Sequence, residues 1–352
     1  MILYDLSSLI HRALHTSIKQ MNPHKKDGKY VTQEFISGTI FRVIEELLEN
    51  YRLYRGKYHT MVICIDDHSI PYWRKSLYPD YKAQRKVQRD ESEINFKEVY
   101  KHINLLIRVL NDYTPFKAIS VPGAEADDII GVLTKKFSKA ESILILSPDK
   151  DFKQLHKFGD VKQYSAITNE WVVNNDPESW ERVHCCLGDA ADNVPRIVDF
   201  SEFTTEFKDY YKGTELDFYK LDENLKQGII KNFNEIHPDI EVYKKQRFGE
   251  ATLNKKIKEF GSLDAFLDSN EIYRLNYNRN YKLVMDSEIP MDIELEILKK
   301  YIESSTDFDM ENMNKYFSFY NITICSQWFG QLWNEMSKPI EMTPWNVDFS
   351  KI

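Results

Sequence analysis

Short apolar runs alternate with longer amphipathic segments along the first part of the chain. Four runs have the length of buried strands, at residues 1–5, 59–66, 116–123 and 142–149. Between them, two segments carry apolar side chains three and four positions apart, which predicts helices at residues 38–54 and 95–113. Alternating strands and helices predict an α/β fold with a mostly parallel sheet that helices cover on both faces.

The pattern changes after Pro195, where strand signals fade and helical patterns rich in charged and aromatic residues dominate. Residues 250–267 predict two helices joined at Gly261, and residues 291–305 predict a further helix. We therefore expect an α/β domain at residues 1–195 and a smaller helical domain at residues 196–335. The remaining residues, 336–352, show no periodicity and are expected to form a loosely held tail.

Composition and charge narrow the class of protein. The chain has 352 residues and a formal net charge of -8, which taken alone argues against a nucleic-acid binder. That argument weakens where the charges are segregated along the chain, as they are here. The four cysteines form no disulfide-like or metal-binding spacing, and no apolar run reaches about 18 residues. We expect a cytoplasmic protein without a signal peptide or membrane span.

Carboxylates stand where the predicted strands end. Asp5 and Asp66 close the first two strands, and Asp149 and Asp151 follow the fourth. In an open parallel sheet, the carboxyl ends of the strands form the crevice where ligands bind. Each of these aspartates alone is typical of a cap or a turn, so the inference depends on their occurring together.

Two further acidic groups belong to predicted helices. Glu125, Asp127 and Asp128 occupy a first helical turn in GAEADDIIGVL, where the helix dipole stabilises negative charge. Asp189 and Asp192 stand three positions apart in LGDAADNVP, which predicts a shared helix face. Alone, the first group is typical of a helix start and the second of a solvated helix face.

Together these segments hold nine carboxylates, which would repel one another strongly without counter-ions. Hard divalent cations bind oxygen-rich clusters of this kind, so the pattern favours Mg²⁺, with Mn²⁺ as a substitute. Too few His and Cys residues lie nearby for zinc. The number of acids predicts two ions, and a two-metal site is typical of phosphodiester hydrolysis.

A basic segment complements the acids. Residues 74–89 contain six basic residues and one acid, Asp80, with aromatic residues before and between them. Cations bind phosphates and aromatic rings stack on unpaired bases, so the segment predicts a nucleic-acid contact. The alternative is a solvated helix with a few buried rings.

These motifs, in this order and spacing, resemble the 5′-nuclease (flap endonuclease) superfamily, and within it the RNase H and 5′-3′ exonuclease enzymes of T-even-type phages. The resemblance rests on GAEADDIIGVL, LILSPDKDFKQL and LGDAADNVP, and extends to CIDDHSIPYWRKSLYPDYKAQR and YNRNYKLVMDSEIP. It covers roughly residues 1–330. It implies a PIN/5′-nuclease-like catalytic domain with a helical arch region at about residues 70–100.

The resemblance also implies roles for individual residues. It implies a first metal held by Asp5, Asp66, Glu125 and Asp127. It implies a second metal near Asp149, Asp151, Asp189 and Asp192, with Asp128 outside the direct ligands. The residues expected to carry catalysis are Lys82, Arg85, Asp127 and Asp149, the two cations by steadying charge on the scissile phosphate. The expected nucleic-acid contacts are Arg74, Tyr81, Lys82, Arg85, Lys86, Arg89, Arg247, Gly249, Lys255 and Lys256.

A second basic patch, residues 244–258, has six basic residues against Glu250. It resembles the latter half of the family's helix-hairpin duplex-binding element, which we place at about residues 244–268. The chain departs from the family pattern here, because about fifty residues are inserted before Gly249 and only that glycine remains. The duplex contact is expected, whereas a K⁺ site at this turn is doubtful. A plain pair of surface helices is the alternative.

The function that follows is a Mg²⁺-dependent 5′-to-3′ exonuclease and flap endonuclease with RNase H-type activity, which removes lagging-strand primers in phage replication. Its expected substrates are nicked, branched or flapped DNA and RNA–DNA hybrids. The expected form is a monomer, with single-strand binding protein or a sliding clamp as candidate partners. Two alternatives remain open: a non-catalytic DNA-binding replisome scaffold, and a haloacid-dehalogenase-type phosphatase, which also places D-x-D after a strand.

Overall fold

The computed structural model describes residues 1–198, 200–212, 221, 223–240, 242–246, 248–304 and 308–336. The contacts within the chain divide it into two compact units. The first unit comprises residues 1–181 and the described residues from Lys282 onward, and the second comprises residues 182–281. The predicted domains, residues 1–195 and 196–335, stay a prediction; the contact-based units group residues 182–195 with the second unit and the described residues from Lys282 onward with the first. The predicted tail, apart from residue 336, lies outside the described residues.

A six-stranded sheet in the order β3-β2-β1-β4-β5-β6 forms the centre of the first unit. Its strands are β1 (Ile2–Asp5), β2 (Met61–Ile65), β3 (Lys117–Ser120), β4 (Ile143–Leu146), β5 (Val161–Ser165) and β6 (Glu170–Val172). The first five are parallel to one another and β6 is antiparallel to β5. The predicted mostly parallel α/β fold is therefore confirmed.

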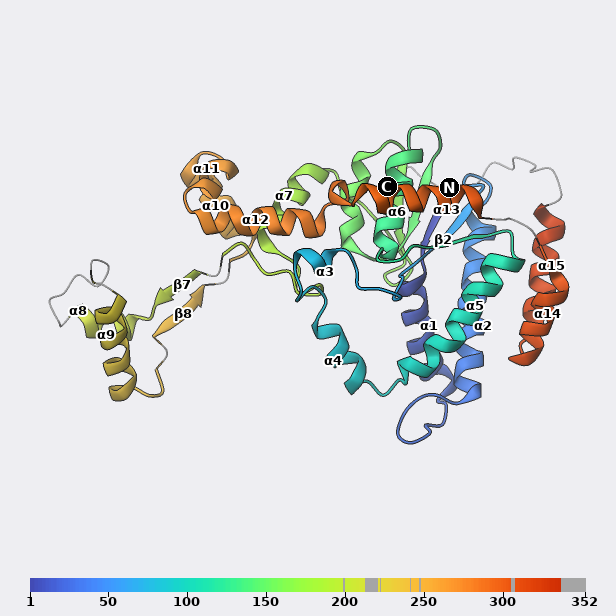
Figure 1. Ribbon diagram of the computed structural model, residues 1–352, viewed down its shortest axis with the longest axis horizontal. Coiled ribbons are helices and arrows are strands. Elements are labelled where there is room, and N and C mark those ends of the chain that lie inside the picture. Colours follow the sequence, from blue (N-terminus) through green and yellow to red (C-terminus); the bar gives the residue numbers. More distant parts are fainter. Residues whose placement is uncertain are drawn as a thin grey trace. The chain divides into compact units, whose positions relative to one another are not determined.

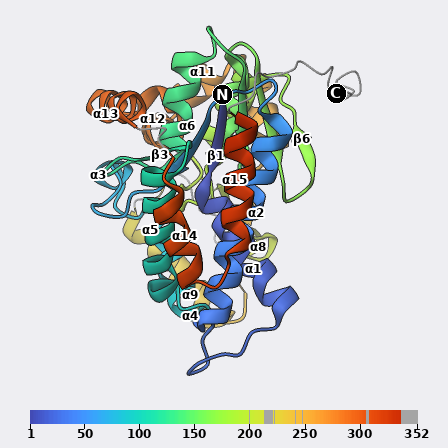
Figure 2. The same cartoon turned by 90° about the vertical axis from the view of Figure 1, so that its right-hand side faces the viewer.

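Helices cover both faces of this sheet, as Figures 1 and 2 show. One core joins alternate residues of the central strands, such as Ile2 and Tyr4, to α1, α2, α5, α14 and α15. The other core joins the intervening residues, such as Leu3, to α6 and α13. The bounds are α1 (Leu6–Met21), α2 (Gln33–Tyr54), α5 (Phe96–Tyr113), α6 (Ala126–Phe137), α13 (Met291–Glu303), α14 (Met310–Phe319) and α15 (Ile324–Met336).

Local sequence signals set the starts of the main helices. The side chains of Asp5, Thr32 and Asn95 cap α1, α2 and α5 by accepting backbone N–H groups of the first turn. Glu125 and Asp128 form a reciprocal capping box at the start of α6. Several of the predicted acidic site residues are thus tied to the backbone where strands pass into helices. The shorter elements between them are α3 (Arg74–Leu77), α4 (Gln84–Glu91), η1 (Lys150–Lys157) and η3 (Asp286–Glu288).

The second unit is mainly helical but contains a strand pair that the sequence pattern did not predict. Strands β7 (Phe200–Phe203) and β8 (Tyr243–Gln246) pair in antiparallel fashion. One small core gathers around Phe207 and Phe233, and another around Phe248 and Phe266. The helices of this part are α7 (Pro177–Leu187), α8 (Thr205–Lys212), α9 (Glu223–Ile236), α10 (Glu250–Phe260), α11 (Leu263–Asp268) and α12 (Glu271–Val284), of which α7 and α12 run across the division between the units.

Gly261 joins α10 and α11 with a left-handed backbone conformation, φ 85°, so the predicted helix pair is confirmed. Among the described residues, none of the helices combines the length and the apolar character that crossing a bilayer requires.

Candidate functional site

Three adjacent parallel strands end in aspartates at the same edge of the sheet. Strand β1 lies between β2 and β4, and Asp5, Asp66 and Asp149 stand at or just after their carboxyl ends. Asp5 is buried and accepts hydrogen bonds from the Ser8 backbone N–H (3.1 Å) and from the Ser147 hydroxyl (2.9 Å). The sheet topology therefore brings together three carboxylates that lie far apart in the sequence.

The start of α6 adds further carboxylates to this edge. The Ala126 N–H donates to Asp66 Oδ1 at 2.8 Å, which links the first turn of α6 to the end of β2. Glu125 is buried at the N-cap position, and Asp127 lies in the first turn of the helix. We refer to Asp5, Asp66, Glu125, Asp127 and Asp149 as the acidic cluster.

Burial and mutual repulsion raise the pKa of two members of the acidic cluster. Burial, and then the charge of Asp66, raise the pKa of Asp5 to about 6. Burial raises the pKa of Asp127 well above its usual value, with further contributions from Asp149, Asp5 and Glu125. Carboxylates in this arrangement repel one another, and a cation placed among them would relieve the repulsion. The donor set consists of carboxylate oxygens, which fits a hard divalent ion.

Three buried side chains of the arch region donate hydrogen bonds to Glu125. Arg74 is 4% exposed, and its Nη1 lies 3.0 Å from Glu125 Oε2 and 2.8 Å from Asp128 Oδ1. The Tyr81 hydroxyl also donates to Glu125 Oε2, at 3.0 Å, and Lys82 pairs with Glu125 Oε1. Glu125 is therefore held by three donors that precede it by more than forty residues in the chain.

Two residues predicted to contact nucleic acid lie in the protein interior. Arg74 and Tyr81, at 4% and 3% exposure, are interior residues, and Arg74 also donates to the Leu283 carbonyl at 2.8 Å. A buried arginine in such a network cannot bind a phosphate without breaking an ion pair. Their position supports a role in holding Glu125, and it does not support the predicted contact with nucleic acid.

Asp128 likewise has both carboxylate oxygens engaged within the protein. Oδ1 pairs with Arg74, while Oδ2 accepts from the Glu125 N–H at 2.8 Å and from Trp73 Nε1 at 3.2 Å. The residue is fully buried. This arrangement fits the expectation that Asp128 stands outside the direct ligands and supports those that bind.

The segment after β4 is held by hydrogen bonds to its backbone. Asp149 caps η1 by accepting from the Asp151 N–H at 2.9 Å. The Gln163 side-chain amide donates to the carbonyls of Ser147 (2.9 Å) and Asp149 (2.6 Å). The turn that presents Asp149 and Asp151 is thus fixed from the neighbouring strand β5, and both carboxylates keep partial exposure.

Asp189 and Asp192 belong to the second unit and do not share a helix face as predicted. Residues 189–194 form a turn closed by paired backbone bonds between Asp189 and Val194, at 2.7 and 2.9 Å. Gly188 precedes it with φ 66°, and a Cβ there would meet the Val194 carbonyl oxygen at 2.3 Å. The convergence of Asp189 and Asp192 on the acidic cluster stays a prediction.

One residue near this turn was not predicted from the sequence. His184, on α7, is 8% exposed, and its Nε2 lies 3.7 Å from Asp189 Oδ2. Its position five residues before Asp189, at the end of an amphipathic helix, was the available signal. Because it is buried close to Asp189, His184 joins the candidate site residues.

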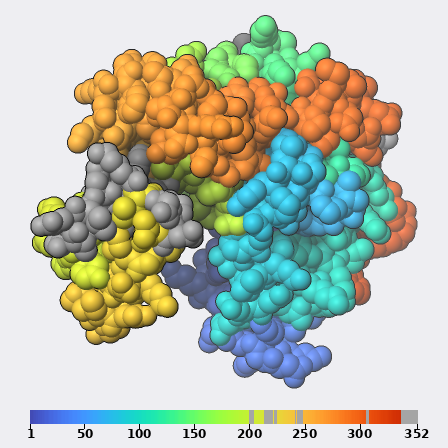
Figure 3. Space-filling model, turned by 60° about the vertical axis from the view of Figure 1, so that its left-hand side comes forward, coloured from blue at the N-terminus to red at the C-terminus, as the bar shows by residue number. Residues whose placement is uncertain are grey.

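The remaining predicted basic residues of the arch region lie on α4. Arg85, Lys86 and Arg89 are exposed, and none of the residues of this helix is buried. In Figure 3 the segment that carries α3 and α4, drawn in cyan and blue, lies on the surface that faces the viewer. Their exposure places all three side chains on the protein surface.

The second basic patch is only partly described. Gly249 caps α10 with φ -124°, and a Cβ there would meet nothing within 4 Å, so no steric need for glycine exists at this turn. Lys255 is exposed, whereas Lys256 pairs with Glu259 at 2.9 Å. Arg247 lies outside the described residues. The duplex contact of this patch stays a prediction.

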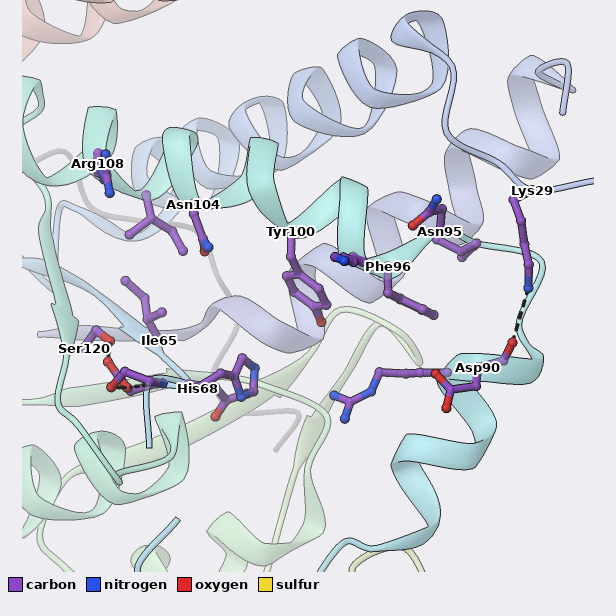
Figure 4. A pocket seen from close by; sticks show the side chains of 17 residues that line it. Lys29, Ile65, His68, Asp90, Asn95, Phe96, Tyr100, Asn104, Arg108 and Ser120 are labelled. Atoms are coloured by element: carbon purple, nitrogen blue, oxygen red, sulfur yellow. Dashed lines mark hydrogen bonds between the residues drawn. The ribbon is translucent and has the colours of Figure 1, made fainter. Parts of the chain in front are cut away.

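A pocket of about 1000 Å³ opens beside the acidic cluster. Figure 4 shows Phe96, Tyr100 and Asn104 projecting from α5 into it, with His68 and Ser120 on the side of the sheet. Its lining includes Asp66 of the acidic cluster and the cations Lys29, Arg89, Lys97 and Arg108. The pocket thus leads from the ends of β2 and β3 toward α4.

Aromatic rings form one wall of this pocket. Phe96 and Tyr100 stack with ring centroids 6.0 Å apart and planes at 26°, and His68 meets Tyr100 edge-on at 6.1 Å. The pKa of Tyr100 is raised by burial and then by Asp66, while Arg89 and Arg85 oppose the rise. Tyr100 lines the pocket together with Asp66 of the acidic cluster and Arg89 of α4. Sequence reasoning missed this wall because the spacing of Phe96 and Tyr100 on an amphipathic helix is typical of core residues.

Comparisons with known proteins agree with this geometry. Residues 1–181 match the family model described as 5′-3′ exonuclease, N-terminal resolvase-like domain. Ribonuclease H of Enterobacteria phage T4 is 36% identical over 151 residues, which span 42% of this chain and 49% of that protein, about half its length. The 5′-3′ exonuclease of Mycoplasmopsis pulmonis is 24% identical over 320 residues, which span 91% of each chain.

Solved structures show the same fold. The D15 protein of phage T5, co-crystallised with metal ions, superposes with a TM-score of 0.51 at 15% identity, over 86% of this chain and 98% of that one. The D15 flap endonuclease in a pseudo-enzyme–product complex with DNA and metal ions gives 0.50 at 15% identity, over 86% and 97%. At this level of identity the likeness is one of fold.

Proposed function

The chain belongs to the 5′-3′ exonuclease family, and from this premise we propose that it is a metal-dependent nuclease that hydrolyses phosphodiester bonds at the 5′ ends of DNA or RNA strands. The observation that carries the proposal is the acidic cluster at the ends of β1, β2 and β4 and the start of α6. The proposed substrates are strands that end at nicks, forks and flaps, where a 5′ end lies beside a duplex.

The acidic cluster supports binding of Mg²⁺, with Mn²⁺ as a substitute. We propose that Asp5, Asp66, Glu125 and Asp127 hold a first ion. A second ion would lie near Asp149 and Asp151, which follow β4. Bound there, the two ions would supply an activated water and a positive charge for the leaving oxygen. Burial and then repulsion by neighbouring carboxylates raise the pKa of Asp5 and of Asp127, and such ions would remove the repulsion.

The protein's own residues would position the strand around these ions. Lys82, which is buried, and Arg85, which is exposed on α4, would stabilise negative charge on the scissile phosphate. Arg85, Lys86 and Arg89 would attract the phosphate backbone. The pocket beside Asp66 would receive an unpaired nucleotide of the same strand, with its base against Phe96 and Tyr100.

Cleavage of a labelled 5′-flap duplex in Mg²⁺ tests the nuclease proposal directly. Asp127→Asn and Asp149→Asn should each lower the rate about 100-fold or more, because each removes charge that the ions require. Asp160→Asn is the matched control, since Asp160 precedes β5 at the opposite edge of the sheet and pairs with Lys57 at 2.8 Å.

Two outcomes would contradict the proposal. A wild-type protein that cleaves no flap, nick or RNA-primed substrate is not a nuclease of this kind, and a DNA-binding scaffold would then be the better interpretation. Cleavage that persists in both variants would show that the ions, if used at all, bind elsewhere.

We extend the proposal to removal of RNA primers from lagging-strand fragments in phage replication, within the host cytoplasm. The similarity to a phage protein named Ribonuclease H supports this extension. A nicked duplex whose 5′ strand begins with ribonucleotides should be shortened at its RNA end. Retention of all ribonucleotides, alongside cleavage of a DNA flap, would refute the primer role and leave the nuclease proposal intact.

A further inference from the structure

Lys82 is proposed to contact substrate, yet its side chain is buried and its backbone conformation is unusual. It is 9% exposed, and its backbone adopts φ 55°, a left-handed conformation that lysine rarely takes. Such a conformation persists where the surrounding structure holds it in place. The turn that contains it is closed by bonds from Ala83 N to Asp80 O and from Arg85 N to Lys82 O.

The Lys82 ammonium group lies among the carboxylates proposed for the first ion. It pairs with Glu125 Oε1, and its charge lowers the pKa of both Asp5 and Asp127, against the upward effect of burial. Its Nζ also lies 5.1 Å from the centre of the Tyr81 ring. One positive charge thus offsets part of the repulsion that a metal ion would otherwise relieve.

The two carboxylate oxygens of Glu125 have different hydrogen-bond partners. Its Oε2 atom accepts from Arg74 Nη1 and from the Tyr81 hydroxyl, each at 3.0 Å. The other oxygen, Oε1, is the one that Lys82 holds. Oε2 already accepts from two buried donors, so Oε1 is the oxygen better placed for a metal ion, and Lys82 holds that oxygen.

We propose that Lys82 is an exchangeable counter-cation: it neutralises the acidic cluster in the metal-free protein, and the first divalent ion displaces it. The proposal rests on the proposed metal site. Displacement moves a charged amine out of the cluster, where it becomes available to a phosphate group. Metal loading would thereby prepare the lysine for the substrate strand, and the metal-free protein would keep it paired with Glu125.

Amine labelling of the wild-type protein tests the displacement. Limited acetylation followed by peptide mass spectrometry should show slow modification of Lys82 in EDTA, because the amine is buried and paired. Addition of Mg²⁺ should raise its labelling rate about fivefold or more, while exposed Lys86 changes by less than about twofold. Unchanged or slower labelling of Lys82 in a protein that binds the ion would overturn the proposal, as would an equal rise at Lys86.

Calorimetric titration with Mn²⁺ supplies a second readout that does not depend on activity. Lys82→Met should bind the ion about tenfold more tightly than wild type, because no charge-assisted hydrogen bond has to be broken. Lys86→Met, which removes an exposed charge one turn further along, should bind within about twofold of wild type. Equal or weaker binding by Lys82→Met would refute the exchange. A wild-type protein that binds no ion would instead refute the proposed metal site, and if Lys82→Met does not fold, the labelling result decides.

Discussion

The replacement Asp286→Asn is expected to stabilise the metal-free protein, and to do so more strongly as the pH rises. Asp286 begins η3, and its Oδ2 atom is buried without a hydrogen-bond partner among the described residues. Its carboxyl group lies against α6, where a Cβ added at Gly131 would meet it at 3.0 Å. Burial raises the pKa of Asp286 to about 8, which Arg74 opposes and Asp128 supports.

The sign of the effect follows from the proton balance. The folded protein holds a proton on Asp286 up to about pH 8, whereas the unfolded chain releases it near its ordinary value of about 4. The free energy of unfolding therefore falls as the pH rises from about 4 to about 8. A shift of about four units corresponds to about 5 kcal/mol. Because the residue as a whole keeps partial exposure, we expect about half of that, ~2–3 kcal/mol.

Urea denaturation in EDTA at pH 5 and pH 9 measures the difference. Asp286→Asn keeps the size of the side chain and does not titrate, so its stability relative to wild type should grow by ~2–3 kcal/mol between the two values. Asp112→Asn is the control, because Asp112 is exposed and has no burial penalty to remove. A stability difference for Asp286→Asn that stays constant or shrinks toward pH 9 would refute the reasoning.

Three further changes test other parts of the structure. Arg74→Met should destabilise the first unit by ~3–5 kcal/mol in urea denaturation, because it leaves the buried carboxylates of Glu125 and Asp128 without their cation. A loss below ~1 kcal/mol would show that these ion pairs are not buried as described. Gly188→Ala should open the Asp189–Val194 turn and increase its cleavage in limited proteolysis. Gly28→Ala, also at positive φ but with open space around it, should leave that turn intact. Equal cleavage of the turn in the two variants would contradict the steric argument. Lys86→Ala and Arg89→Ala should each lower the slope of log affinity for flap DNA against log salt by ~1, and an unchanged slope would place the phosphate contacts elsewhere.

The residue pattern was sufficient to predict the sheet and the acidic residues at its edge. Buried strands and amphipathic helices have distinct periods, so the alternation in the first 195 residues specified a parallel sheet. Parallel strands end at a common edge, which is why Asp5, Asp66 and Asp149 could be placed together before any contact was known. The capping positions of Asp5 and Glu125 are local signals of the same kind.

Which charged residues are buried depends on contacts between distant parts of the chain. The segment around Arg74 was predicted to contact nucleic acid, yet Arg74 donates to the carbonyl of Leu283, which is 209 residues away, and to Glu125, and it forms an ion pair with Asp128 of α6. Burial of a charge depends on partners that arrive from distant parts of the chain, and no local pattern encodes them.

Contacts between distant parts of the chain also explain why three features were not predicted: the turn at residues 189–194, the strands β7 and β8, and the pocket beside Asp66. Spacing predicted a helix face for Asp189 and Asp192, but the backbone pairing of Asp189 with Val194 closes a turn instead. The two strands lie about forty residues apart in sequence, and the pocket is lined by four separate segments. Local residue types specified the elements and the chemistry at their ends, whereas long-range packing specified which side chains remain open to metal and substrate.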